Sequence, residues 1–184
     1  MPARAKQAAK ARYLFLLRHA KAVPDGRDDG DFGRALSERG ESDALKMAAL
    51  FESQGFKPER CLCSPALRTK QTFKALAGLI PGLKASYPKD LYLISHQELL
   101  ERIQKLKDDP VSLLVVGHNP GIERLALALA KPMAGGDDEG LARMKDKFPT
   151  GALAVLRYQG DGWSSLAEET CRLEAFVRPK DLEA

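Results

Sequence analysis

Four side chains that could bind and transfer a phosphoryl group follow three short apolar runs of the chain. Arg18 and His19 follow the first run, Arg68 comes soon after the second, and His118 follows the third. Arginine offers permanently charged donors in the geometry that phosphate oxygens accept, and a neutral imidazole can attack phosphorus as a nucleophile. These residue types therefore predict a site that binds a phosphoryl group and can take it up covalently.

Strands that alternate with helices must position these side chains. The hydrophobic pattern predicts strands over residues 13–17, 61–63, 111–116, 152–158 and 173–177, helices over 38–53, 65–79, 98–106 and 120–130, and a weakly extended segment over 87–94. This alternation is typical of a three-layer α/β fold whose mostly parallel central sheet carries helices on both faces. Ligands of such sheets bind at the carboxyl ends of the strands, so we expect the four side chains to converge at that edge.

Two dipeptides strengthen the prediction of an anion site. Ser64 with Pro65, and Asn119 with Pro120, each follow a predicted strand, and each pair has the form of an N-cap residue before proline at the first helical position. Helix N-termini attract anions, so Asn119 is predicted as a further phosphate-binding residue. A lone histidine at a strand end, or a lone Ser-Pro, is usually only structural. Their joint occurrence after three successive strands favours a functional site.

The charge of the chain is divided between a basic N-terminal segment and a neutral body. The chain has 184 residues and a formal net charge of +4, from 29 Lys and Arg against 25 Asp and Glu. Residues 1–12 hold four of the basic residues and no acid, which leaves 25 of each sign in the remainder. We predict a disordered tail over 1–12 and a single domain over 13–184. We expect no nucleic-acid partner, because only the tail would support one.

Composition also bears on location and cofactors. The longest aliphatic run, over residues 125–130, has six residues, whereas a membrane-spanning helix needs about 20, and the segment before Arg18 lacks the apolar length of a secretory signal. The odd count of three cysteines indicates free thiols in a reducing compartment, so we expect a cytoplasmic protein without membrane contact. Three histidines without finger-like cysteine spacing predict no metal site, and no cofactor is expected.

Beyond these physical arguments, the sequence resembles a known family. The segments that carry the resemblance are, in chain order, LFLLRHAKA, DFGRALSERG, CLCSPALRTKQT, KDLYL, LLVVGHNPGIERLALALA, KFPTGALAVL and FVRPKDL. They are similar to the histidine phosphatase superfamily, which has the phosphoglycerate-mutase-like fold, and in particular to its SixA-like phosphohistidine phosphatase branch. The resemblance runs from about residue 13 to residue 182, and the order RHA, SPxLRxxQT, GHNP makes it specific.

The resemblance implies a role for each residue of the predicted site. His19 would attack phosphorus and become phosphorylated, and Arg18 and Arg68 would hold the phosphoryl oxygens. His118 would donate to the same oxygens, and water would then release phosphate from His19 without a metal. Asp90 stands where many family members place a glutamate, so it could protonate the leaving group; a capping role is the alternative.

The sequence departs from the family pattern at Ala20, where the signature has glycine. This departure bears on the subfamily more than on the activity. Thr150 lies in one of the matching segments, but the residues establish no role for it; positioning of the sheet edge near the pocket is the hypothesis.

Short connections between the predicted strands favour an open pocket, since 24–34 and 132–148 are the plausible flaps. An open pocket would admit a phosphorylated protein, so we predict hydrolysis of phosphohistidine on a signalling protein. The sequence leaves the oligomeric state open, and a monomer is favoured. A small-molecule phosphomonoesterase and a non-catalytic phosphate-binding module remain the alternatives. A cysteine phosphatase needs the spacing C-x5-R, and neither Cys61 nor Cys63 has this spacing to Arg68.

Overall fold

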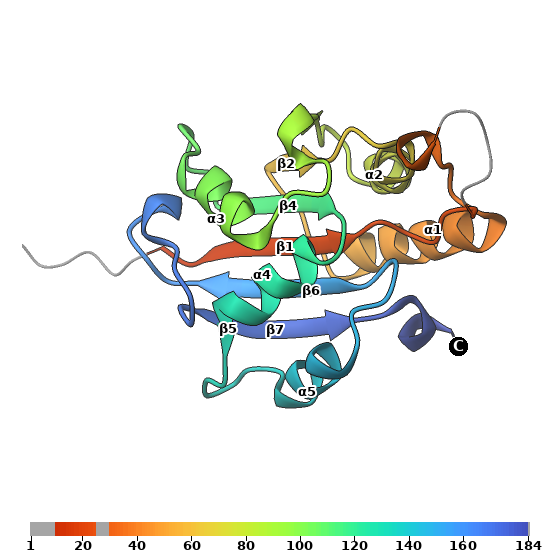
Figure 1. The fold of residues 1–184 in the computed structure, drawn as a ribbon. Helices are drawn as coiled ribbons and strands as arrows, with labels where there is room; N and C mark the ends of the chain where they lie inside the picture. Colours follow the sequence, from red (N-terminus) through yellow and green to blue (C-terminus); the bar gives the residue numbers. More distant parts are fainter. Residues whose placement is uncertain (1–9, 25–29, 184) are drawn as a thin grey trace, which may run out of the picture.

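A mixed β-sheet forms the middle layer of the molecule (Figure 1). In the computed structural model, which describes residues 10–24 and 30–183, this sheet has seven strands in the order β3-β2-β4-β1-β6-β7-β5. They are β1 (Arg12–Arg18), β2 (Arg60–Cys63), β3 (Ala85–Ser86), β4 (Ser112–Gly117), β5 (Ala130–Lys131), β6 (Leu153–Tyr158) and β7 (Cys171–Val177). Neighbouring strands pair in parallel except where β6 pairs with β1 and β7. The predicted mostly parallel α/β sheet is confirmed.

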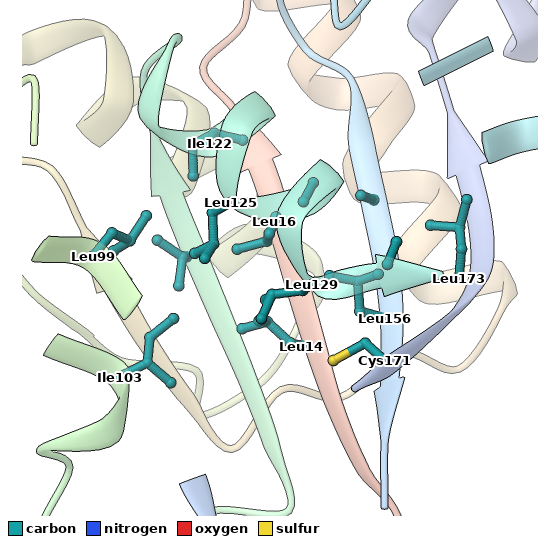
Figure 2. Close-up of a cluster of buried hydrophobic side chains, with 14 of the residues drawn as sticks. Leu14, Leu16, Leu99, Ile103, Ile122, Leu125, Leu129, Leu156, Cys171 and Leu173 are labelled. Carbon is teal, nitrogen blue, oxygen red and sulfur yellow. The ribbon is translucent and has the colours of Figure 1, made fainter. Parts of the chain in front are cut away.

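Helices cover both faces of this sheet. They are α1 (Glu38–Ser53), α2 (Leu67–Leu79), α3 (His96–Gln104), α4 (Gly121–Leu129) and α5 (Asp138–Asp146). Leu14 and Leu16 of β1 belong to the core beneath α3, α4 and α5, which Figure 2 shows in part. Phe15 and Leu17 belong to the core against α1 and α2. Residues 14–17 of β1 are buried against helices on both faces and form an uninterrupted apolar run, as expected for a central strand of a three-layer fold.

Two predictions about segment type are wrong. Residues 135–140, expected as an acidic loop within the flap 132–148, contain the start of α5, which Asp137 caps by accepting a hydrogen bond from the backbone of Gly140. Residues 87–94, expected as extended, contain the 3₁₀ helix η2 (Lys89–Leu91). Acidic residues and glycines usually indicate a loop, but here the first of the acids serves as the N-cap of a helix.

The domain begins one residue earlier than predicted. Arg12 is the first residue of β1, and its buried guanidinium pairs with Asp109 and donates to the carbonyl oxygen of Gly160. Arg12 is therefore part of the fold and does not belong to the tail. Residues 1–9 lie outside the described residues, so the disordered tail stays a prediction.

The three cysteines are free and buried, as their odd number indicates. Burial raises the pKa of the Cys63 thiol to about 12, so this thiol stays protonated near neutral pH and is a poor nucleophile. This agrees with the exclusion of a cysteine phosphatase. Among the described helices, none has the length and apolarity that crossing a membrane requires.

Candidate active site

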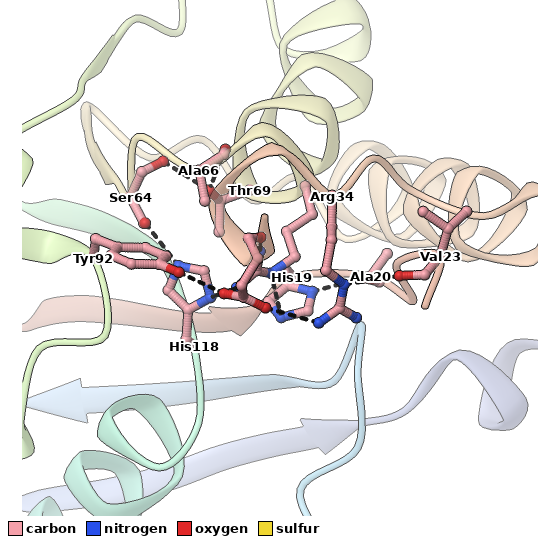
Figure 3. Close-up of polar contacts among 11 residues, drawn as sticks. His19, Ala20, Val23, Arg34, Ser64, Ala66, Thr69, Tyr92 and His118 are labelled. Atoms are coloured by element: carbon pink, nitrogen blue, oxygen red, sulfur yellow. Dashed lines mark hydrogen bonds and ion pairs between the residues drawn. The ribbon is translucent and has the colours of Figure 1, made fainter. Parts of the chain in front are cut away.

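Three central strands bring the predicted residues together. β1 and β2 flank β4 in parallel register, so their carboxyl ends meet at one edge of the sheet. His19 follows β1, His118 follows β4, and Arg68 lies in the first turn of α2. The imidazole rings of His19 and His118 lie 5.2 Å apart between centroids (Figure 3), and Arg68 hydrogen-bonds to both. We call Arg18, His19, Arg68 and His118 the phosphoryl cluster.

His19 is held in the tautomer that suits a nucleophile. Its Nδ1 lies 2.7 Å from the carbonyl oxygen of Ala20, and because a carbonyl only accepts, Nδ1 carries the proton. Nε2 therefore keeps its lone pair, 3.3 Å from Nε of Arg68. The backbone amide of Ala20 in turn donates to Thr72 Oγ1 at 3.1 Å, which fixes the turn behind the imidazole. Nε2 is thus the nitrogen whose lone pair can attack, once it is released from the hydrogen bond that Arg68 Nε donates to it.

Arg68 lies buried in the middle of the cluster, with 3% of the residue exposed. Besides both histidines, its guanidinium donates to the backbone carbonyl of Asp31 and, at 2.9 Å, to the Asp31 carboxylate. Asp31 lies on the 3₁₀ helix η1 (Asp31–Gly33) and also accepts from Arg34, at 2.8 Å, and from Tyr92. The carboxylate therefore occupies donors that a phosphoryl group would need, and substrate binding has to rearrange these hydrogen bonds.

Ser64 and Tyr92 hold the second imidazole in place. Ser64 Oγ lies 2.7 Å from Nε2 of His118, and the ring of Tyr92 meets that of His118 edge-on, with centroids 5.5 Å apart (Figure 3). Ser64 follows β2 directly. The end of β2 therefore supplies a positioning group for the histidine that follows β4.

Both imidazoles are neutral near neutral pH. Burial lowers the pKa of His19 to about 4; the hydrogen bond to Ala20 opposes this shift, and the charges of Arg68 and Arg18 add to it. Burial, followed by the neighbouring His19, lowers the pKa of His118 to about 3. A neutral His19 keeps the lone pair that nucleophilic attack requires.

Arg18 carries a buried donor that the described residues leave unused. Its Nη1 donates to the carbonyl oxygen of Phe148 at 2.8 Å, but its Nε is buried and has no hydrogen-bond partner in the described part of the chain. A buried donor without an acceptor costs free energy, and a phosphoryl oxygen would satisfy it. Arg18, His19 and Arg68 line a cavity of about 500 Å³.

The two predicted N-caps are wrong. Ala66 and Pro120 are the N-cap residues of α2 and α4, and neither makes a capping hydrogen bond with its side chain. The hydroxyl of Ser64 is engaged with His118 instead. The side chain of Ser64 contacts His118 and that of Asn119 contacts the carboxylate of Glu123 and the carbonyl of Phe148, so neither accepts a capping hydrogen bond from its helix.

The side-chain amide group of Asn119 donates its hydrogen bonds to acceptors within the protein. Its Nδ2 donates to the carboxylate of Glu123 at 3.0 Å and to the carbonyl oxygen of Phe148 at 3.1 Å. The same carbonyl accepts from Arg18, so Asn119 ties the start of α4 to the segment that fixes this arginine. Binding phosphate would cost Asn119 one of these bonds, and its phosphate-binding role stays a prediction.

Thr150 lines the cavity at His19, whereas no hydrogen bond to the described residues connects Asp90 to the phosphoryl cluster. The exposed carboxylate of Asp90 accepts from Arg102 of α3 at 3.2 Å, and no hydrogen bond to the described residues joins it to the cluster. Its role as proton donor stays a prediction. Thr150 lines the same cavity as His19, close to where its expected role would place it.

Sequence reasoning missed three residues of this site. Asp31 and Arg34 lie in a segment rich in glycine and aspartate, and Tyr92 lies in the segment expected as extended. The available signal was the resemblance, because DFGRALSERG and KDLYL contain all three. Within residues 10–24 and 30–183, no group of three or more His, Cys, Asp or Glu side chains is placed to hold a metal ion.

Comparisons with known proteins agree with this geometry. The model of the histidine phosphatase superfamily (branch 1) matches residues 14–92. The uncharacterized protein MT1313 of Mycobacterium tuberculosis (strain CDC 1551 / Oshkosh) is 35% identical over 165 residues, which cover 89% of this chain and 100% of that protein.

Solved structures extend the agreement to the fold. A candidate phosphohistidine phosphatase SixA from Nakamurella multipartitia has a TM-score of 0.77 and 29% identity, over 94% of this chain and 99% of that one. Another, from Agrobacterium tumefaciens, has a TM-score of 0.75 and 30% identity, over 91% of this chain and 98% of that one. With the nucleophile, the arginines and the second histidine in one cluster, the chain belongs to the SixA-like branch of the histidine phosphatase superfamily and is a phosphatase.

Proposed function

We propose that the chain removes phosphate from phosphohistidine on a signalling protein, through a phosphohistidine intermediate on His19 and without a metal. The observation that carries the intermediate is the hydrogen bond from Nδ1 of His19 to the carbonyl of Ala20, which leaves Nε2 unprotonated. The substrate is supported by the similar SixA structures, which are described as candidate phosphohistidine phosphatases.

In the first step, Nε2 of His19 forms a bond to phosphorus as the bond to the substrate's imidazole nitrogen breaks. The leaving imidazole keeps the electron pair and takes up a proton, for which Asp90 is the proposed donor. Charge on the phosphoryl oxygens is neutralised by Arg18 and Arg68. Donors aimed at developing charge in a buried site stabilise a transition state strongly, because they need no reorganisation during the reaction.

In the second step, a water oxygen attacks phosphorus and the bond to His19 Nε2 breaks. The water gives up a proton, inorganic phosphate leaves, and His19 returns to its starting tautomer with Nδ1 bound to Ala20. Because burial holds the pKa of His19 at about 4, the free enzyme is ready for another attack at neutral pH without losing a proton first.

Rapid-quench trapping with a ³²P-labelled phosphohistidine protein tests the intermediate. We expect acid-labile, base-stable phosphate on the wild-type chain and none on His19→Ala, with activity lost in the same variant. His96→Ala is the matched control, since His96 lies at the start of α3 and outside the cluster. Full activity of His19→Ala would refute the mechanism, and activity lost on adding EDTA and restored by a divalent ion would refute its metal independence.

A comparison of substrates tests the specificity. We expect kcat/KM for the phosphohistidine protein to exceed that for p-nitrophenyl phosphate and common phosphomonoesters. The reverse order would make the chain a small-molecule phosphomonoesterase. Binding of phosphorylated ligands without turnover by the wild-type chain would make it a phosphate-binding module.

A further inference from the structure

The cavity at His19 continues beyond the phosphoryl cluster into a surface lined by basic side chains. Four of them lie outside the cluster and outside the ion pairs of Asp31 and Asp181, and we call them the basic groove: Lys21, Arg39, Lys147 and Lys180. In Figure 1 the segment after β1, the start of α1 and the C-terminal segment lie together, where the arrow of β1 ends. The groove is therefore an extension of the site at the same edge of the sheet.

Close backbone packing holds the segments of the groove together. A Cβ atom on Gly40 would overlap the carbonyl oxygen of Lys21, so α1 can begin against this segment only because glycine stands there. A Cβ atom on Gly151 would lie 2.7 Å from Cγ of Pro179, which places the residue before Lys180 against the segment that contains Thr150. Close packing therefore fixes the backbone segments that carry the basic side chains of the groove.

Positive charge in this cavity exceeds negative charge by a wide margin. Eight Lys and Arg residues line it, together with one carboxylate, Asp43. Even when the carboxylates of Asp31 and Asp181, which pair with lining arginines, are also counted, the positive charges exceed the negative charges by five. The body of the chain is neutral, so this excess is a local feature.

Binding of a single phosphoryl group does not require the positive charges of the basic groove. Arg18 and Arg68 already serve the phosphoryl group that is removed. In the groove, Arg39 pairs with Asp43 at 3.7 Å, whereas Lys147 and Lys180 form no ion pair with any described residue. Like charges gathered in a cleft raise the local concentration of anions, and here they can bind an anion beside the scissile phosphoryl group.

We propose that the basic groove binds a second oxyanion of the substrate, a phosphate or carboxylate group close to the phosphoryl group that is removed. The substrate class is then a phosphorylated compound with at least one further anionic group. This proposal rests on the phosphoryl site at His19 and is independent of the preference for phosphohistidine.

Isothermal titration calorimetry with two matched ligands tests the groove. Methylphosphonate carries one phosphonate group and methylenediphosphonate carries two, so the ratio of their Kd values reports the second group. For the wild-type chain we expect the diphosphonate to bind at least about 30-fold more tightly. In Lys147→Gln/Lys180→Gln we expect this ratio to fall about tenfold, while methylphosphonate still binds.

A matched control removes the same net charge elsewhere. Lys84 and Lys107 are exposed and do not line the cavity at His19, so Lys84→Gln/Lys107→Gln has to keep the wild-type ratio. Equal Kd values for the two ligands in the wild-type chain would overturn the proposal, and so would an unchanged ratio in the groove variant. Binding needs no turnover, so these outcomes are separate from a failure to find phosphate on His19.

A second pair of ligands identifies the source of the oxyanion. Two peptides carry the same stable phosphonate analogue of phosphohistidine. In one peptide glutamates flank the analogue, and in the other glutamines flank it. A preference for glutamate that the groove variant loses assigns the second oxyanion to carboxylates of a protein substrate. A diphosphonate preference without a glutamate preference assigns it to a second phosphate of a small molecule.

Discussion

The two imidazoles of the active site carry their protons on different nitrogens. His19 donates from Nδ1 to Ala20. Arg68, which has only donors, points Nη2 at Nδ1 of His118 at 3.3 Å, so the neutral His118 has its proton on Nε2 and donates it to Ser64 Oγ. Ser64 therefore sets which nitrogen of His118 faces the site.

Replacing Ser64 by alanine tests this assignment. Ser64→Ala leaves the buried Nε2–H of His118 without its acceptor, which costs about 1–3 kcal/mol, and we expect kcat to fall about tenfold with a smaller change in KM. Ser86→Ala is the control, because that hydroxyl lies on β3 and bonds to the carbonyl of Cys61. Steady-state kinetics showing wild-type kcat in Ser64→Ala would rule out a positioning role.

Residues at strand ends could be predicted from the sequence, and those in irregular segments could not. His19 and His118 follow apolar runs whose strands must lie side by side, so their meeting follows from the topology. Asp31 and Arg34 reach the cluster through a segment without periodicity, whose path depends on contacts such as that of Arg34 Nε with the carbonyl of Val23, 2.8 Å away. No pattern of residue types encodes such a path.

At the scale of elements, a glycine allows the helix α4 to approach its neighbours beside the site. Gly121 begins α4, three residues after His118, and a Cβ atom there would overlap the carbonyl oxygen of Ile94. We expect Gly121→Ala to push α4 away from Ile94, to lower the free energy of unfolding by about 2–4 kcal/mol and to reduce activity. Urea unfolding and steady-state kinetics measure both effects.

Gly78 provides the matched control for this substitution. It lies exposed within α2, and nothing lies within 4 Å of a Cβ atom placed on it. Alanine has the higher helix propensity, so Gly78→Ala should raise the free energy of unfolding by about 0.5–1 kcal/mol. Equal effects of the two substitutions would contradict the close approach at Gly121.

The long elements follow from periodicity, and the short ones do not. The helices α1 and α2 and the strands β1 and β4 lie within one or two residues of their predicted bounds. The strands β3 and β5 have two residues each, which is too short for any hydrophobic period. α5 begins in an acidic, glycine-rich segment, and its N-cap Asp137 also accepts from the backbone of Phe176 on β7, a tertiary contact that sequence does not reveal.

For the whole molecule, net charge is a poor guide to the site. Outside residues 1–12 the basic and acidic residues are equal in number, yet the cavity at His19 gathers eight basic side chains. The fold produces this asymmetry by bringing the segment after β1, the start of α1 and the C-terminal segment to one edge of the sheet. Charge that is balanced along the sequence is therefore separated in space.

The stability of the molecule should depend on the two buried imidazoles between pH 6.5 and about 5. An unfolded histidine binds a proton below about 6.5, whereas folding lowers the pKa of His19 to about 4 and that of His118 to about 3. As the pH falls through this window, the unfolded state takes up protons that the native state does not. Each histidine then reduces the free energy of unfolding by up to about 1.4 kcal/mol per pH unit.

Urea unfolding at pH 7, 6.5, 6, 5.5 and 5 measures this slope. The carboxylates of Asp31, Asp109 and Asp181 have pKa values below the usual range, chiefly because Tyr92, Arg12 and Arg178 donate hydrogen bonds to them, so their stabilising contribution is lost only at a lower pH and does not enter this window. We expect His19→Gln and His118→Gln each to remove about half of the slope that the two histidines add. His96→Gln is the control for loss of a histidine outside the cluster, and a wild-type slope in both cluster variants would mean that the native imidazoles are protonated like those of the unfolded chain. The burial that keeps His19 neutral for attack therefore also lowers the free energy of unfolding at acid pH. The same lowered pKa thus limits the pH range in which the fold is stable.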